Sequence, residues 1–261
     1  MPEKRRKHYR LRPRFFVITG TALLLLITGI LLLVRSCGQE NTAPVPEEPP
    51  QENSESSSEE EGDSRYLVET LFTGDSRTRG MATYGFVPQR QVLAIDGLNH
   101  LDARQKPLFS SREGSECTLA EAVGERAPKR VMISFGINGM NFIEEEEYFS
   151  EYEGLVDDII RQSPESCYIL QAIYPVSAEF SEENPAMSNE TIDRYNERLK
   201  KLADEKSLFF LNTAEALKDE KGALPEEYDA GDGLHLSREA YKVIIRYVRE
   251  HPAPAEEEKS Q

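Results

Sequence analysis

The chain has 261 residues, enough for one or two domains, and a formal net charge of -16. An acidic excess argues against nucleic acid as a partner, because nucleic-acid-binding domains carry basic surfaces. Nine of the acidic residues and no basic residue lie between positions 38 and 64. Residues 1–35 carry eight basic residues and one acidic residue, so this segment offsets the amino terminus, and the part of the chain that is expected to fold is still acidic.

The amino terminus predicts a membrane anchor. Residues 1–14 contain seven Lys or Arg and one Glu, and residues 15–34 follow without a charge. About 20 apolar residues span a bilayer as a helix, and the following Arg35-Ser36-Cys37 lacks the small-residue cleavage site of a signal peptide. Because basic flanks stay in the cytoplasm, we expect a cytoplasmic segment 1–14, a single transmembrane helix 15–34 in the cell membrane, and an extracytoplasmic remainder.

Residues 35–64 predict an acidic linker that does not fold. The segment consists largely of Glu, Ser and Pro, so it cannot bury enough apolar surface to offset the entropy of ordering its chain. Cys37 lacks the small and apolar residues that precede a lipidated cysteine. We expect the folded domain to occupy residues 65–251 and a polar tail to occupy residues 252–261.

Within residues 65–251, short apolar runs alternate with helical patterns, which is typical of a parallel sheet flanked by helices. The sequence therefore predicts an α/β domain with one parallel sheet of five strands, placed at residues 67–73, 92–95, 131–135, 168–174 and 208–211.

Three helices are predicted from apolar residues at helical spacing. One covers residues 142–160, one is capped by Ser188 or Asn189, and the last is capped by Ser237. Cys117 should lie near the start of a helix and Cys167 near the start of a strand, at opposite ends of the domain. This placement disfavours a disulfide between them.

Polar residues follow the apolar runs where a parallel sheet binds ligands, at the carboxyl ends of its strands. The first run ends in Gly74-Asp75-Ser76, the third leads into Gly136-Ile137-Asn138-Gly139, and Asp232-Gly233-Leu234-His235 precedes the last helix. A serine hydroxyl needs a neighbouring base to become nucleophilic, and that base is usually a histidine held by a carboxylate.

The four histidines leave one strong candidate for that base. His8 belongs to the predicted cytoplasmic segment, His251 borders the tail, and His100 is expected in a loop or at the surface. His235 follows Asp232 by three residues, a spacing at which a tight turn can aim both side chains at one strand end. We therefore expect Ser76, His235 and Asp232 to act as nucleophile, base and acid.

Acyl transfer also needs hydrogen-bond donors for the oxyanion of the tetrahedral intermediate. The side-chain amide of Asn138 and the backbone NH groups of Gly97 and Ser76 are the candidates. Arg77 and Arg79, directly after the nucleophile, are either solvated charges on a helix or ligands for an anionic group on the substrate.

In this order the motifs resemble the SGNH subgroup of the GDSL hydrolases, named for the Ser, Gly, Asn and His of four sequence blocks. Ser76, Gly97 and Asn138 fall on the first three blocks, and Asp232 with His235 on the fourth. The resemblance covers nearly all of residues 65–251. It implies a three-layer α/β/α domain of flavodoxin-like type that acts on esters without a metal or organic cofactor.

Two features qualify the resemblance. Gly139 stands where the third block usually has Asp, which reshapes the loop that follows, and the second block around Gly97 is loose. The tripeptide alone is also weak evidence, because Gly62-Asp63-Ser64 repeats it inside the linker without a strand before it.

The sequence thus predicts a membrane-anchored extracytoplasmic serine esterase, whose expected substrate is an O-acetyl group on a cell-envelope glycan. Three alternatives stay open: an O-acyltransferase that receives its acyl group from a membrane partner protein, a lipase or lysophospholipase, and a non-catalytic glycan-binding domain of the same fold.

Overall fold

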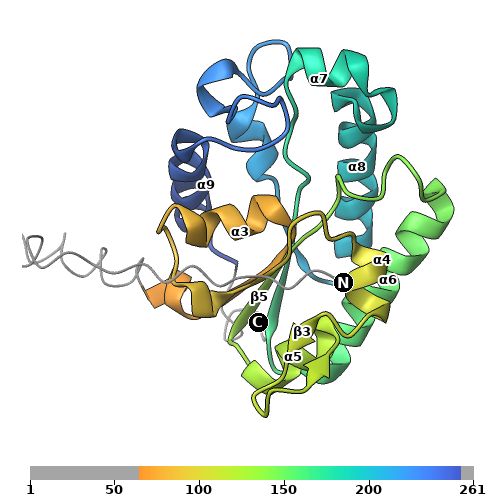
Figure 1. The fold of residues 1–261 in the computed structure, drawn as a ribbon, viewed down its shortest axis with the longest axis vertical. Helices are drawn as coiled ribbons and strands as arrows, with labels where there is room; N and C mark the ends of the chain where they lie inside the picture. Colours follow the sequence, from red (N-terminus) through yellow and green to blue (C-terminus); the bar gives the residue numbers. More distant parts are fainter. Residues whose placement is uncertain (1–64, 254–261) are drawn as a thin grey trace, which may run out of the picture. The chain divides into compact units, whose positions relative to one another are not determined.

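The computed structural model describes residues 65–253, and its centre is a parallel five-stranded sheet (Figure 1). The strand order is β2-β1-β5-β6-β7. The strands are β1 (Thr70–Gly74), β2 (Val92–Ala94), β5 (Arg130–Ser134), β6 (Cys167–Gln171) and β7 (Phe209–Leu211). All five predicted strands are present, within a few residues of their predicted bounds.

Side chains along each strand alternate between two cores, because successive residues of a strand point to opposite faces. In β1, Leu71 packs into one core and Phe72 into the other, and in β5 Val131 and Met132 divide in the same way. The sheet is therefore buried on both faces, as the apolar runs of the sequence require.

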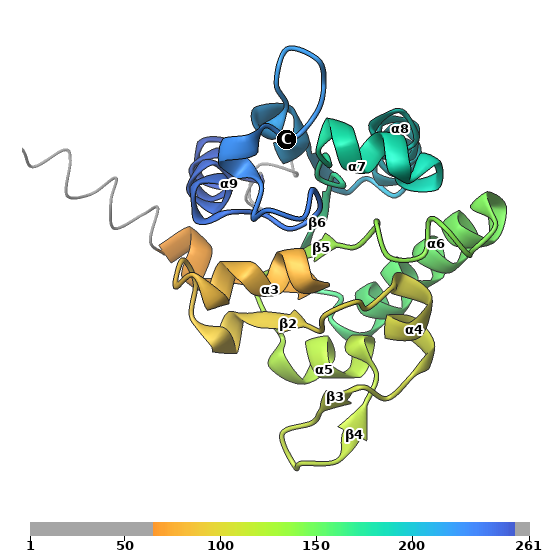
Figure 2. The same ribbon diagram turned by 45° about the horizontal axis from the view of Figure 1, so that its top comes forward.

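Helices cover both faces and complete the predicted three layers (Figures 1 and 2). Helices α3 and α9 pack on the face that holds Phe72, and helices α4, α5, α6 and α8 pack on the other. The helices are α3 (Ser76–Thr83), α4 (His100–Gln105), α5 (Leu119–Arg126), α6 (Glu145–Gln162), α7 (Ala178–Glu183), α8 (Asn189–Glu205) and α9 (Arg238–Glu250). Short 3₁₀ turns lie at Gln89–Gln91, Pro185–Met187, Thr213–Leu217 and Glu226–Tyr228.

The predicted helix caps are confirmed. The side chain of Ser188 accepts a hydrogen bond from the backbone NH of Thr191 at the start of α8, and that of Ser237 accepts one from Ala240 at the start of α9. Helix α6 begins at Glu145 rather than at residue 142, and Phe142 is exposed.

The segment between β2 and β5 holds elements that the sequence analysis did not predict. Helices α4 and α5 flank a short antiparallel hairpin of β3 (Phe109–Ser110) and β4 (Glu116–Cys117). Cys117 is a free thiol, so it forms no disulfide with Cys167; both side chains are buried.

The start of the first strand and the carboxyl-terminal boundary of the domain differ from the prediction. Residues 65–68 form a helical turn before β1 rather than the start of the strand, which leaves Val68 exposed. At the other end Ala253 is buried and donates its backbone NH to the hydroxyl of Tyr66 at 2.9 Å. The first residues of the predicted tail 252–261 thus belong to the fold.

The predicted segments 1–14, 15–34 and 35–64 and most of the tail lie outside the described residues. Within residues 65–253, every helix is too short or too polar to cross a bilayer.

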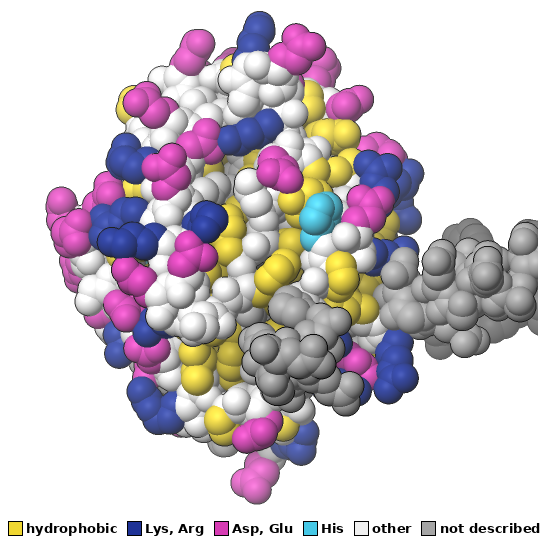
Figure 3. All heavy atoms as spheres, turned by 180° about the vertical axis from the view of Figure 1, so that it is seen from behind, with side chains coloured by type: hydrophobic (Ala, Val, Ile, Leu, Met, Phe, Trp, Pro, Cys, Tyr) yellow, Lys and Arg dark blue, Asp and Glu magenta, His cyan; other side chains and the backbone are white. Residues whose placement is uncertain are grey.

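Acidic and basic side chains are interspersed on the face drawn in Figure 3. Within residues 65–253 many acidic and basic side chains form ion pairs. Arg198 binds Glu145 and Glu146 between α8 and α6, each at 2.9 Å, and Arg104 binds Glu151 on α6 at 2.8 Å. Because such exposed pairs each contribute little, most of the stability must come from the two cores.

Glu69, directly before β1, is the exception among these charges. Its carboxylate binds Lys129 at 2.7 Å, Arg65 at 2.9 Å and Arg130 at 3.3 Å. The hydrogen bonds from Lys129 and Arg65 lower the pKa of Glu69 to about 2. A carboxyl group with a lowered pKa stabilises the fold above its unfolded pKa, and this contribution is lost as the pH falls through the folded pKa.

We therefore expect Glu69→Gln to lower the free energy of unfolding by about 1 kcal/mol at neutral pH, after allowance for solvent screening. The difference from wild type should shrink as the pH falls from about 4.5 toward 2. Chemical denaturation at several pH values measures it. Glu205→Gln is the control, because that carboxylate meets only Lys201, at 3.6 Å. A deficit that persists unchanged at pH 2 would contradict the assignment.

Candidate active site

The turn after β1 presents Ser76 at the first residue of α3. Asp75 caps the helix, and its carboxylate accepts the backbone NH of Arg77 at 2.9 Å. Glycine is required at position 74, because a Cβ there would lie 2.1 Å from the Thr78 hydroxyl and 2.3 Å from the Ser134 carbonyl oxygen. The turn from β1 into α3 is therefore tightly packed at Gly74. Ser76 lies at the amino end of α3, the positive end of the helix dipole.

Ser76, His235 and Asp232 form a continuous hydrogen-bonded relay. Ser76 Oγ lies 3.1 Å from His235 Nε2, and His235 Nδ1 lies 2.6 Å from Asp232 Oδ2. The other carboxylate oxygen of Asp232 accepts the backbone NH of His235 at 2.7 Å and that of Leu234 at 3.0 Å. The structure therefore brings together all three residues that the sequence predicts as nucleophile, base and acid.

The Asp232 carboxylate is held in its charged form. Partial burial alone would raise its pKa, but the hydrogen bonds from the backbone and ring of His235 outweigh this and lower the pKa to about 2. A charged carboxylate beside Nδ1 keeps the proton of a neutral imidazole on that nitrogen. Nε2 is then left to accept the proton of Ser76.

Asp229 organises the loop that carries this pair, a role the sequence analysis missed. Its carboxylate accepts the backbone NH groups of Gly231 at 2.9 Å and Gly233 at 3.0 Å, and the NH of Ala230 binds the carbonyl of His235 at 2.9 Å. The signal is present in the sequence as an acidic, glycine-rich stretch from Asp229 to Gly233, which is typical of a turn stabilised by its own side chains.

The predicted oxyanion donors lie around the same cavity, which has a volume of about 450 Å³ and is lined by Ser76, His235, Gly97 and Asn138. Asn138 Nδ2 donates to Asp75 Oδ2 at 3.0 Å and reaches the Leu98 carbonyl at 3.4 Å. Asp75 therefore holds both the start of α3 and the amide that faces the nucleophile, a second role that the sequence analysis missed.

The backbone at Gly139 explains the departure from the usual third block. Its φ is +118°, a conformation that only glycine adopts without strain. The loop therefore accommodates glycine where an aspartate would be strained, and Asn138 still lines the cavity beside Ser76.

Arg77 is not a solvated charge. Its side chain is buried, and Nη1 donates to the carbonyl of Tyr174 at 2.8 Å. Burial raises the pKa of Asp75, whereas the charge of Arg77 lowers it. The pKa of Asp75 is raised overall, so the charge of Arg77 offsets only part of the effect of burial on this carboxylate.

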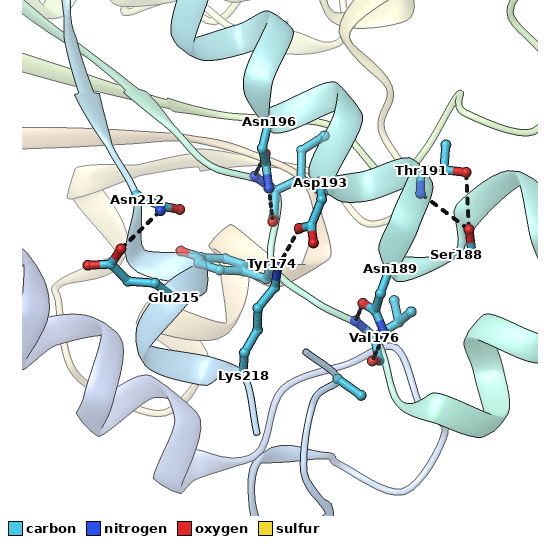
Figure 4. Close-up of polar contacts among 12 residues, drawn as sticks. Tyr174, Val176, Ser188, Asn189, Thr191, Asp193, Asn196, Asn212, Glu215 and Lys218 are labelled. Atoms are coloured by element: carbon cyan, nitrogen blue, oxygen red, sulfur yellow. Dashed lines mark hydrogen bonds and ion pairs between the residues drawn. The ribbon is translucent and has the colours of Figure 1, made fainter. Parts of the chain in front are cut away.

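The segment after β6 that receives Arg77 is fixed by helix α8 (Figure 4). Asn196 binds both backbone groups of Ile173, at 2.7 and 3.0 Å, and Asn189 binds both backbone groups of Val176, at 2.9 and 2.8 Å. The NH of Ser177 then donates to the carbonyl of Gly233 at 2.8 Å, in the loop between Asp232 and His235. Helix α8 therefore fixes a segment that contacts Arg77, next to Ser76, and Gly233, between Asp232 and His235.

Helices α3 and α9 meet directly behind Ser76. The hydroxyl of Tyr241 on α9 donates to the carbonyl of Arg77 on α3 at 2.7 Å. A Cβ at Gly80 would lie 1.9 Å from the same hydroxyl, so glycine permits this close contact between the two helices.

His100 is fully buried, which contradicts the prediction of a loop or surface residue. It starts α4 and packs against Tyr148, with ring centroids 4.2 Å apart, and against Tyr152. Burial lowers the pKa of His100 to about 4, so the ring is neutral at physiological pH and belongs to the core.

Arg79 lies on the rim of the site, where Nη1 forms a 2.8 Å ion pair with Asp96 Oδ2. About half of each side chain is exposed, and both line the cavity of Ser76. Arg79, which the sequence left open as either a solvated charge or a ligand for an anionic group, is thus paired with a carboxylate. Across residues 65–253, acidic, histidine and cysteine side chains form no group suited to a metal ion.

Comparisons with known proteins agree with this geometry. The sequence model of the GDSL-like Lipase/Acylhydrolase family matches residues 72–243, which confirms the resemblance inferred from the motifs. No curated protein sequence matches.

Several solved structures share the fold. One described as a putative platelet activating factor from Streptococcus pneumonia has a TM-score of 0.54 and 21% identity over 74% of this chain and 91% of its own. A GDSL-like lipase from Bacteroides thetaiotaomicron has a TM-score of 0.53 and 19% identity over 72% and 95%. A catalytic mutant of an acetylxylan esterase from Geobacillus stearothermophilus has a TM-score of 0.50 and 19% identity over 71% and 94%.

Proposed function

The chain belongs to the GDSL-like lipase/acylhydrolase family and is an ester-cleaving serine hydrolase, and from this premise we propose that Ser76, His235 and Asp232 carry out the reaction on a small acyl ester of a cell-envelope glycan. The observation that carries the assignment of residues is the relay of 3.1 Å from Ser76 to His235 and 2.6 Å from His235 to Asp232.

In the first half of the proposed reaction, Ser76 Oγ attacks the ester carbonyl while its proton passes to His235 Nε2. A bond forms between Oγ and the carbonyl carbon, and the carbonyl oxygen becomes an oxyanion. Collapse of this intermediate breaks the bond to the alcohol, which leaves with the proton from His235. In the second half, His235 takes a proton from a water molecule whose oxygen bonds to the carbonyl carbon. The bond from that carbon to Ser76 Oγ then breaks, the acid leaves, and His235 returns the proton to Oγ.

The oxyanion would be stabilised by the backbone NH groups of Ser76 and Gly97 and by the amide of Asn138. An amide nitrogen has two N–H groups. The contact with Asp75 at 3.0 Å uses one of them, and the 3.4 Å approach to the Leu98 carbonyl is long enough for an oxyanion to replace it.

The rim of the cavity supports a polar alcohol component. Arg79 and Asp96 together present donors and acceptors without a net charge, beside Thr83 and Tyr84 in the same cavity. A sugar hydroxyl can bind both members of such a pair, whereas a hydrocarbon chain would strip water from two charges without replacing it.

We therefore expect Asp96→Asn to lower kcat/KM for an acetylated sugar by about tenfold and to leave that for p-nitrophenyl acetate within about twofold. The aryl alcohol has no hydroxyl groups for the pair to bind. Asp102→Asn, which breaks the 2.8 Å ion pair of Asp102 with Lys106 on α4, is the control and should change neither value. Equal losses on both substrates would show that Asp96 supports Gly97 rather than the alcohol.

The location of the domain outside the cytoplasm is part of the same proposal. The charge pattern of residues 1–34 supports a transmembrane helix with the domain outside the cytoplasm. Protease added to cells without their wall should then digest the domain, and a protected domain would contradict this location.

Activity itself is tested with the purified full chain in detergent. Acetate release from acetylated saccharides is expected to exceed acid release from long-chain esters. The acetylxylan esterase among the structures of similar fold is the reason to begin with acetyl esters. Adding an unacetylated saccharide distinguishes an esterase from an acyltransferase, since a transferase moves the acetyl group to the sugar faster than to water. Failure to cleave or transfer any ester would overturn the proposal.

A further inference from the structure

A second cavity, which we call the basic cavity, lies at the opposite end of the sheet from Ser76. It has a volume of about 420 Å³ and adjoins the amino ends of β1 and β5. The hairpin β3-β4 and helix α5 lie together at this end (Figure 2). The charged side chains that line the cavity are four cations and one carboxylate: Arg90, Arg112, Arg126, Lys129 and Glu69.

Three of these cations have no acidic side chain as partner. Glu69 binds Lys129, but among residues 65–253 no ion pair involves Arg90, Arg112 or Arg126. Arg126 Nη1 donates instead to the backbone carbonyl of Arg90 at 2.7 Å. The nearby carboxylate of Glu125 accepts the backbone NH of Arg112 at 2.7 Å and forms no ion pair with its guanidinium.

The arrangement leaves like charges close together. Partial burial lowers the pKa of Arg126 and the charge of Arg112 lowers it further, while the carboxylate of Glu125 offsets part of this shift. Arg104 and Arg198, by contrast, each bind carboxylates on α6. A cavity that gathers unpaired guanidinium groups is chemically suited to an anion, because each guanidinium can bind a carboxylate through two N–H groups.

We propose that the basic cavity binds the acidic segment 59–63 of the same chain. This segment, Glu59-Glu60-Glu61-Gly62-Asp63, offers four carboxylates within five residues. The chain between positions 38 and 64 contains no Lys or Arg that could pair with them locally.

The connection of the chain puts this segment within reach. Arg65 binds Glu69 at 2.9 Å, and Glu69 lines the cavity, so the chain enters the domain at the rim of the basic cavity. The four residues from Arg65 back to Glu61 span up to about 14 Å when extended. A segment so close in sequence acts at an effective concentration in the millimolar range.

Binding of this segment would fix the entry of the chain at the pole opposite Ser76. The catalytic cavity would then face away from the preceding linker, whatever ester the enzyme cleaves. The inference rests on charge and connectivity and does not depend on the proposed substrate.

The test compares cleavage of the segment by a glutamate-specific endoprotease in the full chain. We expect Arg90→Glu combined with Arg112→Glu to speed cleavage after Glu59, Glu60 and Glu61 by about tenfold at low salt, because cleavage tracks the undocked fraction. Neither side chain makes a hydrogen bond that the fold needs, so the variant should melt at the wild-type temperature. In about 1 M salt the difference should disappear.

The matched control is Arg246→Glu combined with Arg249→Glu on α9, which changes the net charge equally and lies outside the basic cavity. It should be cleaved at the wild-type rate. Equal cleavage of wild type and the cavity variant would overturn the proposal. So would an unprotected segment in a chain whose basic cavity instead binds vesicles of anionic phospholipid.

A second measurement needs no variant. Among residues 65–253, Lys129 is the only amine that lines the basic cavity, and a zero-length carbodiimide joins an amine only to a carboxylate in contact with it. Peptide mapping should find Lys129 coupled to the segment 59–63 at low salt and not in about 1 M salt. Coupling of Lys129 to Glu69 alone would overturn the proposal.

Discussion

Replacing Ser76 by alanine is expected to lower kcat/KM for a small acetyl ester by about 10³-fold or more, with no change in melting temperature. The hydroxyl is the only group in the relay that can form the acyl bond. Its loss leaves the oxyanion donors in place but removes covalent catalysis. Initial rates of acetate release, with thermal melting beside them, measure the effect.

The chain provides its own control for this substitution. Ser64 belongs to a second Gly-Asp-Ser tripeptide, in the predicted linker, so Ser64→Ala tests the same sequence without the strand and helix that place Ser76. It should retain full activity. If Ser76→Ala kept wild-type turnover, or if Ser64→Ala lost it, the assignment of the nucleophile would be wrong.

The second large effect is expected at Asp232. Asp232→Asn should lower kcat by about 10²-fold to 10⁴-fold while Ser76 and His235 stay in place. An amide can donate to Nδ1 of the ring, which favours the tautomer with its proton on Nε2. That tautomer cannot accept the proton of Ser76. The partial exposure of Asp232, at 54% of its side chain, argues for the lower end of this range.

The pH dependence follows from the lowered pKa of Asp232. Because this pKa is about 2, the carboxylate is charged throughout the working range of an esterase. The ratio of wild-type to Asp232→Asn activity should therefore be constant between about pH 5 and about pH 8. It should fall only as the pH drops below about 4 toward 2, where wild type also loses the charge. A ratio that changes near neutral pH would contradict this ionisation state.

Asp219→Asn is the matched control for the turn itself. Asp219 also accepts backbone NH groups within its own turn, from Lys221 at 2.8 Å and Ala223 at 2.9 Å, but it has no histidine partner. Its replacement should affect stability slightly and kcat not at all. A similar loss of activity in both variants would point to loop folding rather than to the tautomer of His235.

The sequence was sufficient for the sheet because its strands are buried on both faces. Such strands read as continuous apolar runs, and all five were predicted. Leu67 and Val68 extended the first run in the sequence, but they form a helical turn. The pattern of a short apolar run does not separate these two conformations. The hairpin β3-β4 was missed because its strands have only two residues each, too few for a periodic pattern.

The hydrogen-bonded relay of Ser76, His235 and Asp232 could be predicted because its residues follow strands or precede helices in a recognisable order. The supporting contacts could not. Arg77 and His100 are polar residues whose burial depends on elements far away in sequence: Arg77 binds the carbonyl of Tyr174, 97 residues later, and His100 packs against α6. Local composition predicts that such side chains are exposed, and tertiary packing overrides it.

The contact between Tyr241 and Gly80 has a mechanical consequence for the site. Helix α3 begins at Ser76 and helix α9 begins three residues after His235, so Ser76 and His235 lie at the starts of two helices that are joined by the side chain of Tyr241 packed on the backbone of Gly80. Helix α3 connects β1 to β2, and α9 is the last helix of the domain. A shift of either helix therefore displaces Ser76 and His235 relative to each other. The distance between Ser76 Oγ and His235 Nε2, on which proton transfer depends, is thus set by the contact between Tyr241 and Gly80.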